Sequence, residues 1–286
     1  MTKQEVTLKR SILYVPGSNK RALSKVALLN ADGYILDLED AVAPEIKDEA
    51  RNNVCEFLES NSEINSKLVI RINPIDSKWG TNDLSAICKA GAKNILLPKV
   101  EKSDDILKCV SCLPNKDGIN IWAMVETPLG VLNALDIATS STLLKCFVMG
   151  TSDLVNDLRA QHTPDRIASF YSLSHCVLVA RAAGIDIVDG VHLDLRNNVD
   201  LERSCVQGRT LGFDGKSLIH PSQIAIANET YSPTEEDVKH SSKILSAFDK
   251  AKKNGEGVVV VDGKLIENLH VENAKRILHM AGQIKK

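Results

Sequence analysis

The chain repeats one unit, in which an apolar run of strand length precedes a stretch of helical length. Eight such runs occur, at residues 11–17, 33–40, 68–73, 94–100, 119–130, 146–153, 185–192 and 212–220. The stretches between them have helical amphipathic spacing, for example at residues 19–29, 83–90, 104–112, 129–139, 167–183 and 201–211. Parallel strands with right-handed helical crossovers close into a barrel when eight units are present. The sequence therefore predicts a TIM (β/α)8 barrel over residues 10–228.

A doubly wound parallel sheet is the alternative for such a pattern. Against it, no G-x-G-x-x-G follows the first strand and no G-x-x-x-x-G-K occurs, so the two commonest phosphate-binding loops are absent. Polar residues also follow nearly every strand, as they do around the mouth of a barrel active site. These residues are Asp37, Glu39, Asp40, Arg71, Asn73, Lys99, Glu126, Asp153, Asp189, His192, Lys216 and His220.

Two successive strands end at a carboxylate. Glu126 follows the apolar residues 122–125, and Asp153 follows residues 147–150. Carboxylate oxygens at neighbouring strand ends are the ligands that Mg²⁺ prefers, and Mg²⁺ is usually bound by one or two of them. Acids at strand ends can also cap the next helix or form turns. The residues alone leave both interpretations open.

Arg71 lies within an otherwise apolar strand, where a guanidinium is costly to bury without an anionic partner. One interpretation is a bidentate clamp on a substrate carboxylate. The other is a structural ion pair with Glu39 or Asp40 at the neighbouring strand end. Both can hold at once.

Charge, hydropathy and cysteine usage restrict the partners. The net charge of −2 lacks the basic excess that nucleic-acid binding requires, and no apolar run approaches the ~20 residues that span a bilayer. The polar leader at residues 1–9 does not resemble a signal peptide, so we expect a cytoplasmic protein. Seven scattered cysteines do not form a disulfide pattern, and the single C-x-x-C, Cys109 and Cys112, lacks the further ligands of a zinc site.

The pattern changes beyond residue 228. Residues 229–286 predict a helix reaching about Lys253, a stop at residues 254–257, a hairpin at 258–266 with an Asp-Gly turn, and a helix at 271–281. About 55 residues bury too small a core to be confidently independent. We expect this C-terminal extension to pack on its own barrel or on a neighbouring subunit.

An ordered set of motifs carries a resemblance over nearly the whole chain. They are RSILYVPGSN, ADGYILDLEDAVAPEIKDEAR, LVIRIN, ETPLG, GTSDLVNDL, ARAAGIDIVDGV, LGFDGKSLIHPSQI and VDGKLIE. In order and spacing they resemble the citrate lyase β-subunit family of acyl-CoA lyases, within the HpcH/HpaI aldolase superfamily. The resemblance implies a TIM barrel, a homotrimer, bound Mg²⁺ and a C-terminal segment that closes over an adjacent subunit's site.

The resemblance also implies roles for residues. Glu126 and Asp153 match the metal-binding acids, and Arg71 matches a substrate-binding and catalytic arginine. Glu39 and Asp40 match an acidic signature that holds metal waters and orients this arginine.

Arg10, Lys47 and Arg51 match basic positions that meet coenzyme A phosphates. Lys47 and Arg51 are four residues apart on a helix, however, and a solvated helix face is the alternative for them.

The implied reaction is cleavage of a 3-hydroxyacyl-CoA, such as citramalyl-CoA or malyl-CoA, to acetyl-CoA and a 2-oxo acid, or the reverse condensation. An acid must protonate the departing enolate. The family uses an aspartate in the C-terminal segment, where this sequence has Glu267. Two further departures are Leu173 in place of an arginine and Arg159 in place of a glycine.

Two other functions remain open. The chain resembles a citrate lyase β subunit, which would cleave a citryl thioester on an acyl carrier protein beside a transferase subunit. It could also be a barrel that has lost lyase activity.

Overall fold

The structure, a computed structural model, describes residues 7–253 and 258–284. It divides into two compact units, one spanning Lys9–Thr230 and the other containing the chain from Tyr231 onward. Each unit is described by itself. No helix in the described ranges is both long and apolar enough to cross a membrane.

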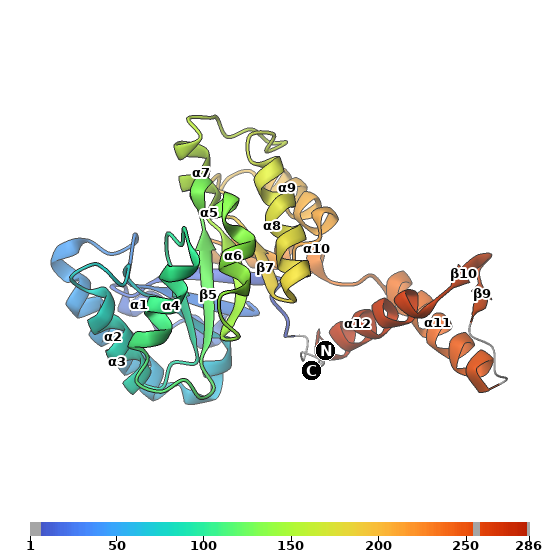
Figure 1. Ribbon diagram of the computed structural model, residues 1–286, viewed down its shortest axis with the longest axis horizontal. Helices are drawn as coiled ribbons and strands as arrows, with labels where there is room; N and C mark the ends of the chain where they lie inside the picture. The colour runs from blue at the N-terminus through green and yellow to red at the C-terminus, as the bar shows by residue number, and fades with distance from the viewer. Residues whose placement is uncertain (1–6, 254–257, 285–286) are drawn as a thin grey trace. The chain divides into compact units, whose positions relative to one another are not determined.

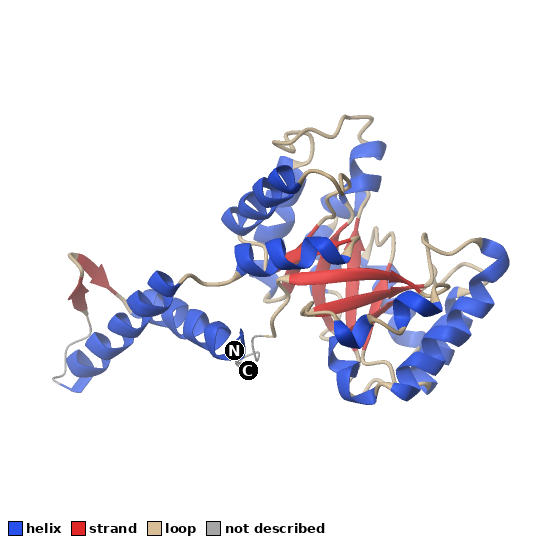
Figure 2. Ribbon diagram, turned by 180° about the vertical axis from the view of Figure 1, so that it is seen from behind, coloured by secondary structure: helices blue, strands red, loops and turns tan. Residues whose placement is uncertain are grey.

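The first unit is a closed barrel of eight parallel strands in sequential order, which confirms the predicted fold. Figure 2 shows the strands surrounded by helices. The barrel closes where Ser11 of the first strand pairs with Lys216 of the last. The strands are β1 Ser11–Pro16, β2 Gly33–Asp37, β3 Leu68–Arg71, β4 Asn94–Leu97, β5 Asn120–Val125, β6 Leu144–Met149, β7 Asp186–Asp189 and β8 Gly215–Leu218.

Helices connect the strands and form the outer layer (Figure 1). They are α1 Lys20–Leu23, α2 Lys47–Ser60, α3 Gly80–Lys89, α4 Ser103–Cys112, α5 Pro128–Leu132, α6 Ala134–Thr139, α7 Thr151–Asp157, α8 Phe170–Ala183, α9 Asn198–Leu211 and α10 Ile224–Tyr231. Short 3-10 turns lie at Val26–Leu28, Pro44–Ile46, Ser62–Lys67 and Pro221–Gln223.

Two predicted helices are divided. The stretch at 19–29 forms α1 followed by a 3-10 turn, and the stretch at 129–139 forms α5 and α6 with Asn133 between them. Asn133 has φ −95° and ψ 9°, and its side-chain amide donates to the carbonyl oxygen of Glu101. Asparagine favours such breaks because its side chain competes with helical backbone bonding.

Side chains alternate between the two faces of each strand, so every second residue points into the barrel. The interior cluster consists of inward-facing side chains from β1 to β7, namely Ile12, Ile35, Val69, Leu96, Trp122, Met124, Cys146, Val148 and Val188. The next inward positions toward the C-terminal ends are Tyr14, Asp37, Arg71 and Glu126, because successive side chains point to opposite faces. On these four strands the apolar cluster thus gives way to polar groups at the last inward position.

The second unit contains α11 Glu235–Lys253, β9 Val259–Val261, β10 Lys264–Ile266 and α12 Asn268–Ile284, as predicted. The two strands pair antiparallel, and Asp262 and Gly263 at the turn have φ of 48° and 77°. These positive values match the preference of Asp-Gly for a tight hairpin. A small core holds the unit, formed by Ile244, Val261, Ile266, Val271 and Ala274. The predicted helix stop at 254–257 lies outside the described residues.

Candidate active site

A cavity of about 430 Å³ opens at the C-terminal ends of the barrel strands. Its lining combines charged and apolar groups from seven of the eight strands or the loops that follow them, including Tyr14, Asp37, Asp40, Arg71, Met124, Glu126, Asp153, Val191 and Ser217. In TIM-barrel enzymes the active site lies at this face. The structure therefore brings the predicted acids Glu126 and Asp153 and the predicted arginine into one cavity.

Glu126 follows β5 and is only 2% exposed. Its Oε1 accepts a 2.7 Å hydrogen bond from the backbone N–H of Lys99, which has a left-handed φ of 51°. Burial raises the pKa of Glu126 to about 7; the Lys99 N–H opposes this rise, and the nearby charge of Asp153 adds to it. The carboxylate is thus an anion that its own surroundings stabilise poorly, and a bound cation would reverse that cost.

Gly150, at the end of β6, allows Glu126 to lie where it does. A Cβ at this position would fall 2.3 Å from Glu126 Cβ and 2.5 Å from Glu126 Oε2. These distances are well inside van der Waals contact. Glycine is therefore required here for close approach of the carboxylate to the backbone.

Asp153 lies in the first turn of α7, directly after β6, and is partly exposed in the same cavity. Its side chain makes no hydrogen bond or ion pair with any other residue of the described ranges. The described part of the chain holds no group of three or more Asp, Glu, His or Cys with metal-binding geometry. Two carboxylates fit Mg²⁺, which usually takes one or two of them and completes its shell with water and substrate oxygens.

Arg71, 6% exposed, is held mainly by Asp37 rather than by Glu39 or Asp40. The Arg71 Nε and Nη2 atoms each donate to one Asp37 oxygen at 2.6 Å, while Nη1 lies 3.3 Å from Glu39 Oε2. Asp37 also accepts from the N–H groups of Glu39 and Ala41, at 2.9 Å each. The alternative of a structural ion pair thus holds, but with a different principal partner from those expected.

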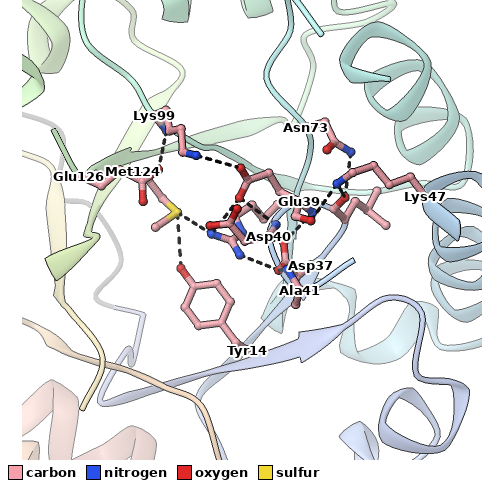
Figure 3. A network of polar contacts seen from close by, with 12 residues as sticks. Tyr14, Asp37, Glu39, Asp40, Ala41, Lys47, Asn73, Lys99, Met124 and Glu126 are labelled. Atoms are coloured by element: carbon pink, nitrogen blue, oxygen red, sulfur yellow. Dashed lines mark hydrogen bonds and ion pairs between the residues drawn. The ribbon is translucent and has the colours of Figure 1, made fainter. Parts of the chain in front are cut away.

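Glu39 and Asp40, the acidic signature, lie near Asp37 (Figure 3). Glu39 is buried, accepts from the N–H of Asp40, and lies 3.6 Å from Lys99 Nζ. Burial raises the pKa of Glu39, and the Arg71 guanidinium opposes that rise. Asp40 is exposed and lines the cavity. Glu39 contacts Arg71 Nη1 and helps to orient the guanidinium.

The three predicted coenzyme A contacts are all engaged within the barrel. Lys47 is buried, and its Nζ donates to the carbonyl oxygens of Leu38 and Glu39 at 3.0 and 2.8 Å, so it is not part of a solvated face. Arg51 pairs with Asp83 at 3.1 Å and with Asp48 at 2.7 Å. Lys47 thus supports the loop after β2, and Arg51 joins α2 to α3.

Arg10 precedes β1, at the opposite end of the barrel strands from the cavity. Its Nε and Nη2 each donate to Asp32 at 2.8 Å, and its backbone N–H donates to the same carboxylate at 2.9 Å. This geometry gives Arg10 a structural role at the base of the barrel. Coenzyme A contact by Arg10, Lys47 and Arg51 stays a prediction.

A second buried ion network, formed by Asp189 and Lys216, ties β7 to β8. Both side chains are fully buried, and Lys216 Nζ donates to Asp189 at 3.0 Å. Arg166, which sequence reasoning missed, donates from Nη1 to both Asp189 oxygens at 2.8 Å. His220 instead accepts from the N–H of Ser222 and caps a turn.

The structure shows the local environment of each residue that departs from the family pattern. Arg159 has a φ of 53°, the left-handed region that glycine adopts without strain, which explains why a glycine suits this position. Leu173 is fully buried in α8. Glu267 is exposed at the start of α12, in the second unit, and its backbone N–H donates to His270 Nδ1.

The barrel and its mouth define an enzyme of the TIM-barrel class. The model of the HpcH/HpaI aldolase/citrate lyase family matches residues 10–221. The chain therefore belongs to this family, as its motifs predicted, and it is an enzyme of the carbon–carbon lyase class.

Full-length relatives are similar over both units. The chain is 43% identical to a (3S)-malyl-CoA thioesterase of Cereibacter sphaeroides strain KD131, over 96% of this chain and 95% of the relative. It is 32% identical to the citrate lyase subunit beta of Escherichia coli strain K12, over 98% and 96%. Among solved structures, CitE from Mycobacterium tuberculosis in complex with magnesium, acetoacetate and coenzyme A has a TM-score of 0.78 and 26% identity, covering 98% of this chain and 100% of that one.

Proposed function

We propose that the enzyme is a Mg²⁺-dependent lyase that cleaves a 3-hydroxyacyl-CoA of the malyl-CoA or citramalyl-CoA type to acetyl-CoA and a 2-oxo acid, or runs the reverse condensation. The observation that carries the proposal is the meeting of Glu126, Asp153 and Arg71 in one cavity at the barrel mouth. Two carboxylates suit a hard cation, and a guanidinium suits a substrate carboxylate. The magnesium, acetoacetate and coenzyme A of the similar CitE structure support this choice of ligands.

Each residue of the site has a separate role in this reaction. Glu126 and Asp153 hold the metal, and the chemistry that a bound Mg²⁺ supplies is stabilisation of negative charge on substrate oxygens. Arg71 binds the carboxylate of the 2-oxo acid with the N–H groups that Asp37 does not occupy. Asp37, assisted by Glu39, fixes the position of Arg71, and the backbone N–H of Lys99 fixes that of Glu126.

Proton transfer falls to Glu267. In the cleavage direction the 3-hydroxyl group loses its proton to solvent as it becomes the carbonyl of the 2-oxo acid, the bond between C2 and C3 breaks, and the Glu267 carboxyl group donates a proton to the methylene carbon of the acetyl-CoA enolate. In condensation the Glu267 carboxylate removes that proton, and the new alkoxide takes one from solvent. This residue lies in the second unit, and we propose that the chain forms a homotrimer in which Glu267 reaches the barrel cavity of a neighbouring subunit.

Thioester hydrolysis is a second candidate, favoured by the 43% identity to malyl-CoA thioesterases. Cleavage of a citryl thioester within a citrate lyase complex is a third, favoured by the full-length similarity to citrate lyase β subunits. All three use the same cavity and differ in the bond that breaks or in the carrier of the acyl group.

The products formed by the purified chain distinguish these functions. With malyl-CoA, citramalyl-CoA or citryl-CoA and Mg²⁺, a lyase releases equal amounts of acetyl-CoA and a 2-oxo acid, and EDTA stops the reaction. We expect this result with malyl-CoA or citramalyl-CoA. Release of free coenzyme A without acetyl-CoA would establish hydrolysis instead. Activity that appears only after carrier and transferase subunits are added would establish the citrate lyase subunit.

Glu267→Ala tests the proton donor separately. Loss of a positioned general acid typically costs about 100- to 10,000-fold in rate, so kcat for the best ester should fall by that range while Mg²⁺ affinity stays unchanged. Glu267→Asp, which restores the family residue, should retain most of the rate. Glu236→Ala is the matched control, because Glu236 is exposed on α11 in the same unit. Wild-type kcat in Glu267→Ala would remove this residue from the mechanism.

A further inference from the structure

Tyr14 is an inward-facing residue of β1 that none of the proposed steps uses. Its side chain packs on the interior cluster of the barrel and lines the same cavity as Glu126, Asp153 and Arg71. Within the described ranges its hydroxyl has a single hydrogen-bond partner, the Met124 sulfur at 3.5 Å (Figure 3). A phenol facing a polar cavity thus has only a thioether as its acceptor.

The same sulfur also receives a second donor. Arg71 Nη1 lies 3.4 Å from Met124 Sδ, so the hydroxyl and the guanidinium converge on one atom. Thioether sulfur is a weak acceptor, whereas a carboxylate oxygen accepts strong, charge-assisted bonds from a guanidinium. An anionic oxygen placed between these two donors would therefore replace the sulfur as their acceptor.

Two further observations favour a donor role for the hydroxyl. The Arg71 guanidinium lies 5.0 Å from the centre of the Tyr14 ring, so the two groups hold a fixed mutual position. Burial raises the pKa of Tyr14; the Arg71 charge opposes that rise, and the charges of Asp37, Glu126 and Glu39 add to it. The phenol consequently keeps its proton across the physiological pH range.

We propose that the Tyr14 hydroxyl and Arg71 Nη1 together bind one carboxylate oxygen of the 2-oxo acid, which makes Tyr14 a specificity-determining residue. This inference rests on the proposed function and deepens it. Arg71, on β3, supplies the charge, and Tyr14, on β1, supplies a neutral directional donor. The pair selects substrates whose carbonyl carbon carries a carboxylate over analogues with a neutral group there.

The test measures binding directly, with pyruvate and glyoxylate as probes. Calorimetry at saturating Mg²⁺ should show the Kd of the better probe rising roughly 10- to 100-fold in Tyr14→Phe, the range expected when one hydrogen bond to a charged group is lost. Phenylalanine keeps the ring beneath the guanidinium. Mg²⁺ affinity without a probe should stay at its wild-type value, which shows that the metal site is intact. The preference of the wild type for pyruvate over pyruvamide should shrink in the variant.

Met124→Leu separates hydrogen bonding from packing. Leucine keeps the approximate volume but removes the sulfur acceptor, so pyruvate binding should tighten severalfold because nothing competes for the two donors. If Met124→Leu weakens binding as much as Tyr14→Phe does, Tyr14 acts through packing and the inference is overturned.

Two outcomes distinguish failure of this inference from failure of the proposed lyase function. Equal pyruvate affinity in wild type and Tyr14→Phe overturns the role of Tyr14 while leaving the lyase intact. A wild-type enzyme that binds Mg²⁺ but neither 2-oxo acid overturns both.

Discussion

Glu126→Gln should weaken Mg²⁺ affinity by more than about 100-fold and remove Mg²⁺-dependent activity. Loss of a residue that only hydrogen-bonds to a metal ligand costs about 10- to 100-fold in metal affinity. Loss of the charge of a ligand itself should cost more. Glutamine has nearly the same shape, and its amide oxygen can still accept from the Lys99 N–H. The substitution therefore removes the charge while preserving the local geometry. Calorimetry with Mg²⁺, or spin resonance with Mn²⁺ as its substitute, gives the affinity.

Glu101→Gln is a suitable control, since it makes the same chemical change at a partly exposed position after β4. The Mg²⁺-free stability of Glu126→Gln should equal or exceed that of the wild type, because a buried carboxylate that its surroundings disfavour has been neutralised. A Glu126→Gln enzyme with wild-type Mg²⁺ affinity would refute the metal site.

Asp37→Asn should lower the free energy of unfolding by about 3–5 kcal/mol, the typical effect of removing one partner from a buried ion pair. Arg71 is then left as a buried charge with Glu39 as its nearest carboxylate. Urea unfolding of the Mg²⁺-free protein measures the change. Asp48→Asn serves as the comparison, because Asp48 forms an exposed pair with Arg51 and should change stability by less than about 1 kcal/mol.

Arg71→Met combined with Asp37→Asn adds a double-mutant cycle to this measurement. The double variant should be more stable than the sum of the single changes predicts, because it leaves no uncompensated charge in the interior. Additive effects of the two changes would mean that the pair is not coupled.

The barrel could be predicted because its signals are local. Each buried parallel strand is a short apolar run, and alternation within a run such as Ile35 to Asp37 shows where the inward face becomes polar. The ends of strands mark the mouth, so Glu126 and Asp153 could be assigned to one region without knowledge of their separation. The break at Asn133 was missed because it depends on a contact with Glu101, a residue of another loop.

The partner of Arg71 could not be predicted for a related reason. Asp37 and Arg71 are directly paired in the register of β2 and β3, and register depends on how the strands meet, not on either strand alone. Lys47 illustrates the same limit. Its helical spacing from Arg51 indicated a surface face, whereas the tertiary structure turns its ammonium group inward onto two carbonyl oxygens.

The double hydrogen bond between Asp37 and Arg71 also bears on how tightly a small anion can be held. Ordering a free arginine side chain costs roughly 1.5–2 kcal/mol of conformational entropy. Here that ordering occurs when the barrel folds, so an arriving 2-oxo acid meets a guanidinium whose orientation is already set. The entropy cost of ordering this side chain is therefore not subtracted again when the ligand binds. The ordering of Arg71 during folding thus favours the binding of a ligand of only a few atoms.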